Sequence, residues 1–265
     1  MSSHSERNAP WKGSKNGPRG RGAGRREAVT DDWLWGWHAV SAALANPARE
    51  PADRLLATPD RAKELTSRFG KNPALEIVEN GVISHNLPSG AVHQGLALQI
   101  ALLDSVALEE FEARRGAVIL MLDQVTDPQN VGAILRSAAA FGASGVILQD
   151  RHAPKLTGAR AKAAAGAVDQ ISTSHVVNLS RALETLADLG WRAVGLDGSA
   201  PQALEQALDG SATVLVLGSE GDGLRRLVAE HCDALGKIPM PGGFESLNVS
   251  AAAAVALYEA SRTRP

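Results

Sequence analysis

The sequence is poor in cysteine and has no long apolar run. Cys232 is the single cysteine among 265 residues, so no disulfide can form within the chain, and this usage fits a reducing compartment. The first residues lack the apolar core of a secretion signal. No stretch reaches the ~18 apolar residues that a membrane-spanning helix needs. These absences predict a cytoplasmic protein.

Several site motifs are also missing. The chain has no Walker A loop, and His38 and His93 stand in no metal-ligand spacing. His231 next to Cys232 is not a catalytic pair merely by adjacency, and we interpret Cys232 as a buried or helix-surface thiol. We therefore expect no metal centre and no thiol chemistry.

The formal net charge of −2 conceals an uneven distribution. Residues 1–30 carry seven Lys or Arg and two Glu, which makes this segment +5 and leaves −7 for the rest. It is too polar to bury enough surface to fold, so we predict a disordered basic tail. The tail either keeps the protein soluble or acts as an electrostatic arm for RNA phosphates. The sequence does not choose between these roles.

Residues 31–103 have the pattern of a small α/β domain. The sequence predicts strands near 54–58, 76–78 and 96–103, and helices that end before Asn46 and that span Arg61–Phe69. Trp33, Trp35 and Trp37 alternate as on one face of a strand, which favours core packing over base stacking. Residues 104–115 are charged and amphipathic and predict a short helical linker. No catalytic constellation appears in this part of the chain.

Residues 116–265 alternate between strand and helix patterns. Apolar runs at 117–122, 145–148, 192–196 and 213–217 predict strands, and the text between them predicts helices at 129–141, 156–166, 179–189 and 202–208. Such alternation favours a parallel sheet covered on both faces. Ligands of such sheets bind beyond the carboxyl ends of the strands, and three motifs begin at such ends.

The first motif is DPQNVGAILRS, Asp127 to Ser137. Asp127-Pro128 predicts a turn, and Asn130 is a plausible helix N-cap. Arg136 then lies in the N-terminal part of the helix, where phosphate is favoured. An ordinary cap and a solvated charge would explain both residues equally well.

The second motif is GSEGDGL, Gly218 to Leu224, directly after an apolar strand. Its glycines permit positive φ and close approach of a ligand. Glu220 is suited to accept hydrogen bonds from a ribose or adenine, or to orient a cation; an exposed carboxylate in a simple turn is the alternative. The spacing G-x-x-G-x-G, about 45 residues from the C-terminus, leaves no room for a dinucleotide-binding fold.

The third motif, Pro239 to Ser250, is a Pro-Gly-Gly turn followed by a helix expected to start near Ser246. Ser246 and Asn248 then lie at the helix mouth, where backbone N–H groups are free. Locally, a capping sequence before a core helix would suffice. The segment is informative because it occurs together with the other two motifs.

In this order, the three motifs resemble the signature of the SpoU (TrmH-like) RNA 2′-O-ribose methyltransferases of the SPOUT superfamily. The resemblance covers residues 33–265 and implies a parallel-sheet SPOUT domain, residues 116–265, with a C-terminal trefoil knot. It also implies S-adenosylmethionine as cofactor and a homodimer. LWGWHAVSAAL and LPSGAVHQGLAL are similar to the small RNA-substrate-binding domain of the 23S rRNA guanosine-2′-O-methyltransferase branch.

The resemblance also implies roles for single residues. Asn130 and Arg136 match the family's essential pair, while Glu220, Ser246 and Asn248 would orient the ribose, Arg136 and the cofactor. The cofactor would be held largely by backbone groups of Gly218, Ile238 and Leu247. Arg136 would act either as the base on the 2′-OH or as a group that fixes phosphate and stabilises the alkoxide.

The expected activity is methyl transfer to a ribose 2′-OH of RNA, with a guanosine of 23S rRNA as the leading substrate. A tRNA ribose is an alternative substrate. A different class of protein, a non-catalytic RNA-binding ribosome-assembly factor, is a further alternative. The presence of all five polar motif residues argues against that class, since loss of catalysis would leave them free to change.

Overall fold

A computed structural model describes residues 33–49, 51–101, 103–150, 166–219, 221, 223–244 and 246–263. The predicted basic tail, the helix expected over 156–166 except for its last residue, and the predicted site residue Glu220 lie outside these residues. Within them, no helix is both long enough and apolar enough to cross a membrane.

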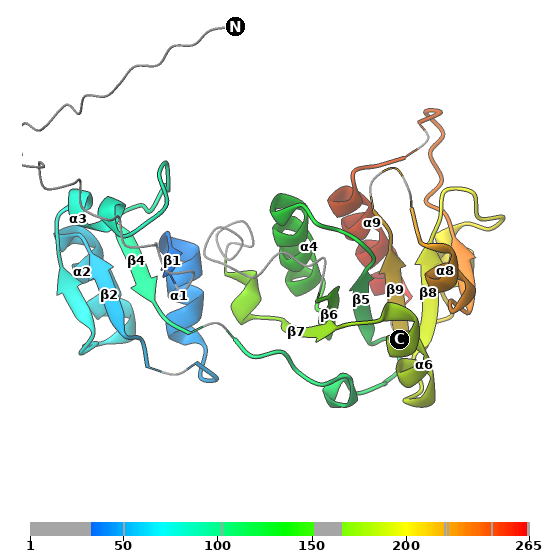
Figure 1. Ribbon diagram of the computed structural model, residues 1–265, viewed down its shortest axis with the longest axis horizontal. Helices are drawn as coiled ribbons and strands as arrows, with labels where there is room; N and C mark the ends of the chain where they lie inside the picture. Colours follow the sequence, from blue (N-terminus) through cyan, green and yellow to red (C-terminus); the bar gives the residue numbers. More distant parts are fainter. Residues whose placement is uncertain are drawn as a thin grey trace, which may run out of the picture.

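The first unit is a four-stranded sheet in the order β1-β4-β2-β3 (Figure 1). Its strands are β1 (Trp33–Trp35), β2 (Arg54–Ala57), β3 (Leu75–Ile77) and β4 (Leu96–Gln99). Strands β2 and β3 are parallel, and β4 runs antiparallel to β1 and β2. The helices are α1 (Trp37–Ala45), α2 (Pro59–Phe69) and α3 (Asn80–His85), the last of which the sequence did not predict.

The tryptophan pattern is largely confirmed. Trp33 and Trp35 are buried and pack with Ile83 of α3. Trp37 departs from the strand, because Gly36 takes a positive φ of 86° and Trp37 begins α1. A glycine tolerates that conformation at little cost, so the chain turns from strand to helix there.

The segment after β4 is not the short helix that its charge pattern predicts. Its regular structure is one 3-10 turn, η1 (Leu108–Glu110). Phe111 is buried in the core on one face of the second sheet, with Val106 and Leu108 packed against it. The apolar residues are therefore used to hold an extended strap on that sheet, and a continuous helix could not present them in this way.

The second unit is a six-stranded parallel sheet in the order β10-β8-β9-β5-β6-β7, as predicted in type (Figure 1). The strands are β5 (Val118–Leu122), β6 (Gly145–Gln149), β7 (Ser172–Val176), β8 (Arg192–Leu196), β9 (Thr213–Leu217) and β10 (Ala234–Gly236). Strands β7 and β10 were not predicted, because STSHV is largely polar and ALG is very short.

Alternate residues of the central strands face two separate cores. Val118, Leu120 and Leu122 pack on the face covered by α4 (Pro128–Ala140) and α9 (Val249–Arg262). Ile119 and Met121 pack on the face covered by α6 (Leu179–Asp188) and α8 (Arg226–Glu230). Two short elements, α7 (Leu204–Ala207) and η2 (Ala167–Asp169), complete the unit. This double coverage explains why β5 and β9 are buried throughout and apolar apart from Thr213.

The two units meet where α1 packs against η2. Arg49 forms an ion pair with Asp169, and the two side chains are only 5% and 1% exposed. Arg49 Nη1 also donates to the carbonyl oxygen of Ala101. A Cβ on Gly166 would lie 2.7 Å from the carbonyl oxygen of His38, so the glycine is needed for this close approach. The apolar core is continuous across the contact.

Candidate functional site

The first and third motifs meet directly in the structure. Asn130 lies in the first turn of α4 and Asn248 is the N-cap of α9. Asn248 Nδ2 donates to Asn130 Oδ1 at 3.1 Å, although 118 residues separate them in the chain. The starts of these two packed helices therefore bring two predicted site residues into contact beside the carboxyl end of β5.

The orientation of Asn248 is fixed by its capping role. Its Oδ1 accepts hydrogen bonds from Ser250 N at 2.9 Å, Ser250 Oγ at 2.6 Å and Ala251 N at 3.4 Å. Since the oxygen is engaged in this way, the amide nitrogen faces Asn130. The sequence placed the helix start near Ser246, which was wrong: Ser246 is exposed and precedes the cap.

Asn130 is not the cap of α4, contrary to the sequence prediction. Asp127 is the N-cap, and its Oδ1 accepts from Gln129 N at 2.9 Å. Pro128 fits the next position because a proline at the start of a helix forfeits no hydrogen bond. Asn130 therefore lies inside the first turn, where its side chain can contact Asn248. Gly142, with φ 63°, follows the end of the helix as predicted.

Arg136 lies six residues beyond Asn130, about 9 Å further along the helix. It is the ninth of the 13 residues of α4, past the middle of the helix, so its predicted place near the N-terminal end was wrong, because Asp127 and not Asn130 is the N-cap. The side chain of Arg136 is exposed and has no hydrogen bond or ion pair with any other residue that the structure describes. The guanidinium is thus available to a ligand from solution. Its place in the mechanism stays a prediction.

The glycine loop of the second motif closes on itself. Ser219 and Gly223 exchange two backbone hydrogen bonds of 3.2 Å. A Cβ on Gly218 would lie 2.1 Å from the carbonyl carbon of Gly223, so no other residue fits there. Gly221 and Gly223 have φ of 96° and 66°, which side chains disfavour. Backbone atoms are therefore exposed at the loop tip.

Sequence reasoning missed the ion pair that anchors this loop. Arg225 Nε donates to Asp123 Oδ1 at 2.7 Å, and Arg225 N donates to Asp123 Oδ2 at 3.0 Å. Arg225 Nη2 also donates to Gln149 Oε1 at 3.1 Å. Asp123 is fully buried just after β5, and Gln149 is the last residue of β6. The position of Asp123 directly after a buried strand could have indicated in the sequence that this carboxylate has a partner.

The remaining predicted cofactor positions differ in exposure. Ile238 is half-buried against the core, whereas the Leu247 side chain is 40% exposed. These apolar groups and the exposed backbone of the glycine loop suit S-adenosylmethionine as a ligand. Backbone groups and apolar surface can hold its adenosine and methionine parts without a charged side chain. No hydrogen bond within the described chain joins Gly218, Ile238 and Leu247, so their shared role stays a prediction.

The single thiol is not a nucleophile of this site. Burial, together with the nearby carboxylates of Asp233 and Asp123, raises the pKa of Cys232 to about 12. The thiolate is the reactive form, so the group is inert at neutral pH. No cluster of three potential metal ligands occurs among the residues that the structure covers.

Known proteins resemble the chain in both sequence and structure. A 23S rRNA (guanosine-2′-O-)-methyltransferase RlmB of Xanthomonas campestris is 38% identical, over 88% of this chain and 97% of that protein. An uncharacterized tRNA/rRNA methyltransferase of Mycobacterium avium is 35% identical, over 95% of each. A crystal structure of an RNA 2′-O ribose methyltransferase aligns with a TM-score of 0.72 at 26% identity, covering 87% and 88% of the two chains.

A further solved structure shares the fold. The SpoU methyltransferase AviRb from Streptomyces viridochromogenes, in complex with the cofactor AdoMet, aligns with a TM-score of 0.74 at 24% identity. The alignment covers 87% of this chain and 89% of that one. It supports the arrangement of elements described above.

The fold, a parallel sheet covered by helices on both faces, is that of an α/β RNA methyltransferase. The model of the SpoU rRNA Methylase family matches residues 117–258. The chain belongs to this family, and as a member it is an RNA methyltransferase that uses S-adenosylmethionine.

Proposed function

We propose that this protein transfers a methyl group from S-adenosylmethionine to the ribose 2′-OH of a guanosine in 23S rRNA. The observation that carries the proposal is the Asn248–Asn130 hydrogen bond, which joins two family motifs into one site. The choice of 23S rRNA is supported by the RlmB relative, which this chain matches over nearly that protein's full length.

Arg136 is proposed to bind the phosphate next to the target ribose and to stabilise the developing alkoxide. Its guanidinium is exposed, and a fixed cation of this kind stabilises negative charge that develops in a transition state. We prefer this role to proton abstraction, because a guanidinium holds its proton in proteins. The rest of the rate acceleration comes from positioning the hydroxyl beside the methyl donor.

The other site residues are assigned orienting roles. Asn130 and Asn248 hold one another, and with Ser246 and Glu220 they would fix the ribose and Arg136. Gly218, Ile238 and Leu247 would hold the cofactor through backbone and apolar surface. S-adenosylmethionine supplies an electrophilic methyl group when bound.

A second copy of the chain is the proposed partner of α9. Val255 and Tyr258 lie on one side of this helix and are 41% and 53% exposed. Phe244 and Leu247, just before the helix, are 79% and 40% exposed. The family resemblance implies a homodimer, and an apolar surface next to the site is what such an interface would bury. Sedimentation of the full chain tests this.

The decisive experiment is transfer of a labelled methyl group to unmodified 23S rRNA, with tRNA in parallel and Arg136→Ala as the matched variant. Nucleoside digestion then shows whether the label is on a guanosine ribose. Arg136→Ala should lower turnover by at least about a hundredfold, the cost of removing one group that stabilises developing charge, with cofactor affinity unchanged. Label on tRNA alone would overturn the assignment of 23S rRNA as the substrate. No label with no cofactor bound would favour a non-catalytic assembly factor.

A further inference from the structure

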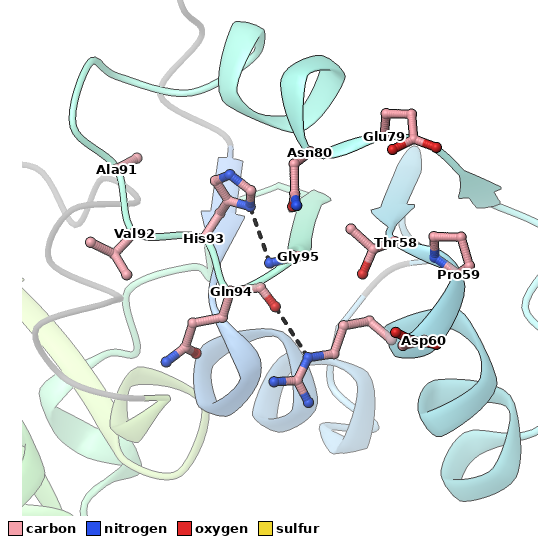
Figure 2. Close-up of a pocket in the computed structure, with 11 residues that line it drawn as sticks. Thr58, Pro59, Asp60, Glu79, Asn80, Ala91, Val92, His93, Gln94 and Gly95 are labelled. Carbon is pink, nitrogen blue, oxygen red and sulfur yellow. Dashed lines mark hydrogen bonds between the residues drawn. The ribbon is translucent and has the colours of Figure 1, made fainter.

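A cavity of about 760 Å³ lies in the first unit. None of the residues that line it belongs to the proposed methyl-transfer site. The cavity opens where the parallel strands β2 and β3 end and where α2 and α3 begin, and the loop before β4 closes its other side (Figure 2). The carboxyl ends of parallel strands are the usual ligand edge of such sheets. The volume lies within the range of about 300–1,000 Å³ typical of sites for small organic groups.

The cavity presents hydrogen-bonding groups of several kinds. Figure 2 shows the amide of Asn80 and the hydroxyl of Thr58 directed towards the space in front of His93 and Gly95. Within the described chain, the Asn80 side chain has no hydrogen-bond partner. The carboxylates of Asp60 and Glu79 also line the cavity. An amide and carboxylates together suit a ligand that carries both donors and acceptors.

The loop that closes the cavity is held rigidly. Gln94 takes a positive φ of 54°, which a side chain other than glycine adopts at a cost. Gly95 N donates to His93 Nδ1 at 3.1 Å, so His93 Nε2 carries the proton and donates to Ser84 Oγ at 3.0 Å. Gln94 Oε1 accepts from Trp37 N, and the Gln94 carbonyl accepts from Arg61 Nε at 3.1 Å. The cavity wall is thus preformed.

Cationic groups stacked on an aromatic ring lie beside the cavity. The guanidinium carbon of Arg61, which lines it, is 5.3 Å from the ring centre of Trp37. Arg68 approaches the same ring at 5.9 Å. Arg61 Nη1 also pairs with Glu64 Oε2 at 2.5 Å, so this guanidinium already has an anionic partner and serves here to hold the cavity wall.

We propose that this cavity binds an unstacked base of the substrate RNA. The inference rests on the proposed function. Proteins that read RNA take single-stranded bases out of the stack and hydrogen-bond their edges. Asn80 is placed to pair with such an edge, and Glu79 and Asp60 can accept from amino groups of the base. Asp60 and Glu79 disfavour a phosphate inside the cavity, so the base is the part of the RNA that fits it.

The test uses three variants of the full chain with unmodified 23S rRNA transcript as the probe. Asn80→Ala removes the amide, and Val92→Glu places a charge on a cavity-lining residue that is 62% exposed. Val82→Glu is the control, because it adds the same charge at a position on α3 that is 44% exposed and does not line the cavity. RNA affinity, KM and kcat are measured, together with cofactor affinity.

Asn80→Ala and Val92→Glu should each weaken RNA affinity and raise KM about tenfold, the effect of losing one or two hydrogen bonds to a base. Val82→Glu should change them less than twofold, and kcat and cofactor affinity should be unchanged in all three. Equal effects of Val92→Glu and Val82→Glu, with no effect of Asn80→Ala, would overturn the site and leave a protein ligand as the alternative. Absence of methyl transfer by the unmodified chain would refute the proposed function instead, since RNA affinity is measured separately.

Discussion

At the scale of single residues, Asn248 performs two tasks with two different atoms. Its oxygen caps α9 and its nitrogen donates to Asn130. We therefore expect stability and activity to depend on separate halves of this side chain. This division allows a substitution that removes one task and keeps the other.

Asn248→Asp should keep the cap and lose the donor. We expect it to change the free energy of unfolding by less than about 0.5 kcal/mol while strongly lowering methyl transfer, because Asp caps helices as well as Asn does. Asn248→Ala should lose activity and also about 1 kcal/mol of stability. Urea unfolding and initial rates measure the two effects. Full activity in Asn248→Asp would show that the contact with Asn130 is dispensable.

Between elements, one ion pair connects the glycine loop to two strand ends. Arg225 follows the loop and reaches Asp123 after β5 and Gln149 in β6. Gln149 Nε2 in turn donates to the carbonyl oxygen of Val177, just beyond β7. The position of the loop over the sheet thus depends on a chain of polar contacts at the carboxyl edge of the strands.

The two partners of this pair should differ in how much their removal costs. Arg225→Ala leaves a fully buried carboxylate without its cation, which we expect to cost about 3 kcal/mol. Asp123→Asn should cost about 1 kcal/mol, because the Arg225 side chain is 39% exposed and can turn to water. Chemical unfolding of both variants gives the comparison. A larger loss for Asp123→Asn would mean that burial of the carboxylate is not the controlling factor.

At the scale of the whole molecule, the Arg49–Asp169 pair holds the two units together. Asp169→Asn leaves Arg49 buried and unpaired, so we expect a loss of about 3 kcal/mol and a raised KM for RNA, with cofactor affinity unchanged. Replacing both charges, Arg49→Met with Asp169→Leu, should recover the stability. Calorimetry and steady-state kinetics distinguish these cases. An unchanged KM in Asp169→Asn would show that docking of the units does not position the RNA.

The division of the chain into a tail at 1–30, a substrate-binding domain at 31–103, a linker at 104–115 and a methyltransferase domain at 116–265 stays a prediction. So does the trefoil knot. The two sheets described here agree with such an arrangement.

Much of the fold could be predicted because the spacing of apolar residues along the chain agrees with which residues are buried. After Thr213, the run VLVL is apolar because both faces of β9 are covered, and it predicts the strand by itself. The polar edge strand β7 and the short β10 give no such signal, because an edge strand is defined by its neighbour. The prediction of a helical linker at 104–115 was wrong for a related reason. Phe111 packs on a sheet formed by distant parts of the chain, and that contact is not visible in the local pattern.

The sequence by itself determined the class of fold, the family and the residues that belong to the three motifs, because these depend on local spacing and residue type. Only the tertiary structure decided that Asp127 caps α4, that Asn130 meets Asn248, and that Arg225 is held by Asp123. The last two contacts join residues more than a hundred positions apart. No local pattern encodes such a pairing, since it arises when packed helices and parallel strands bring distant segments to one edge.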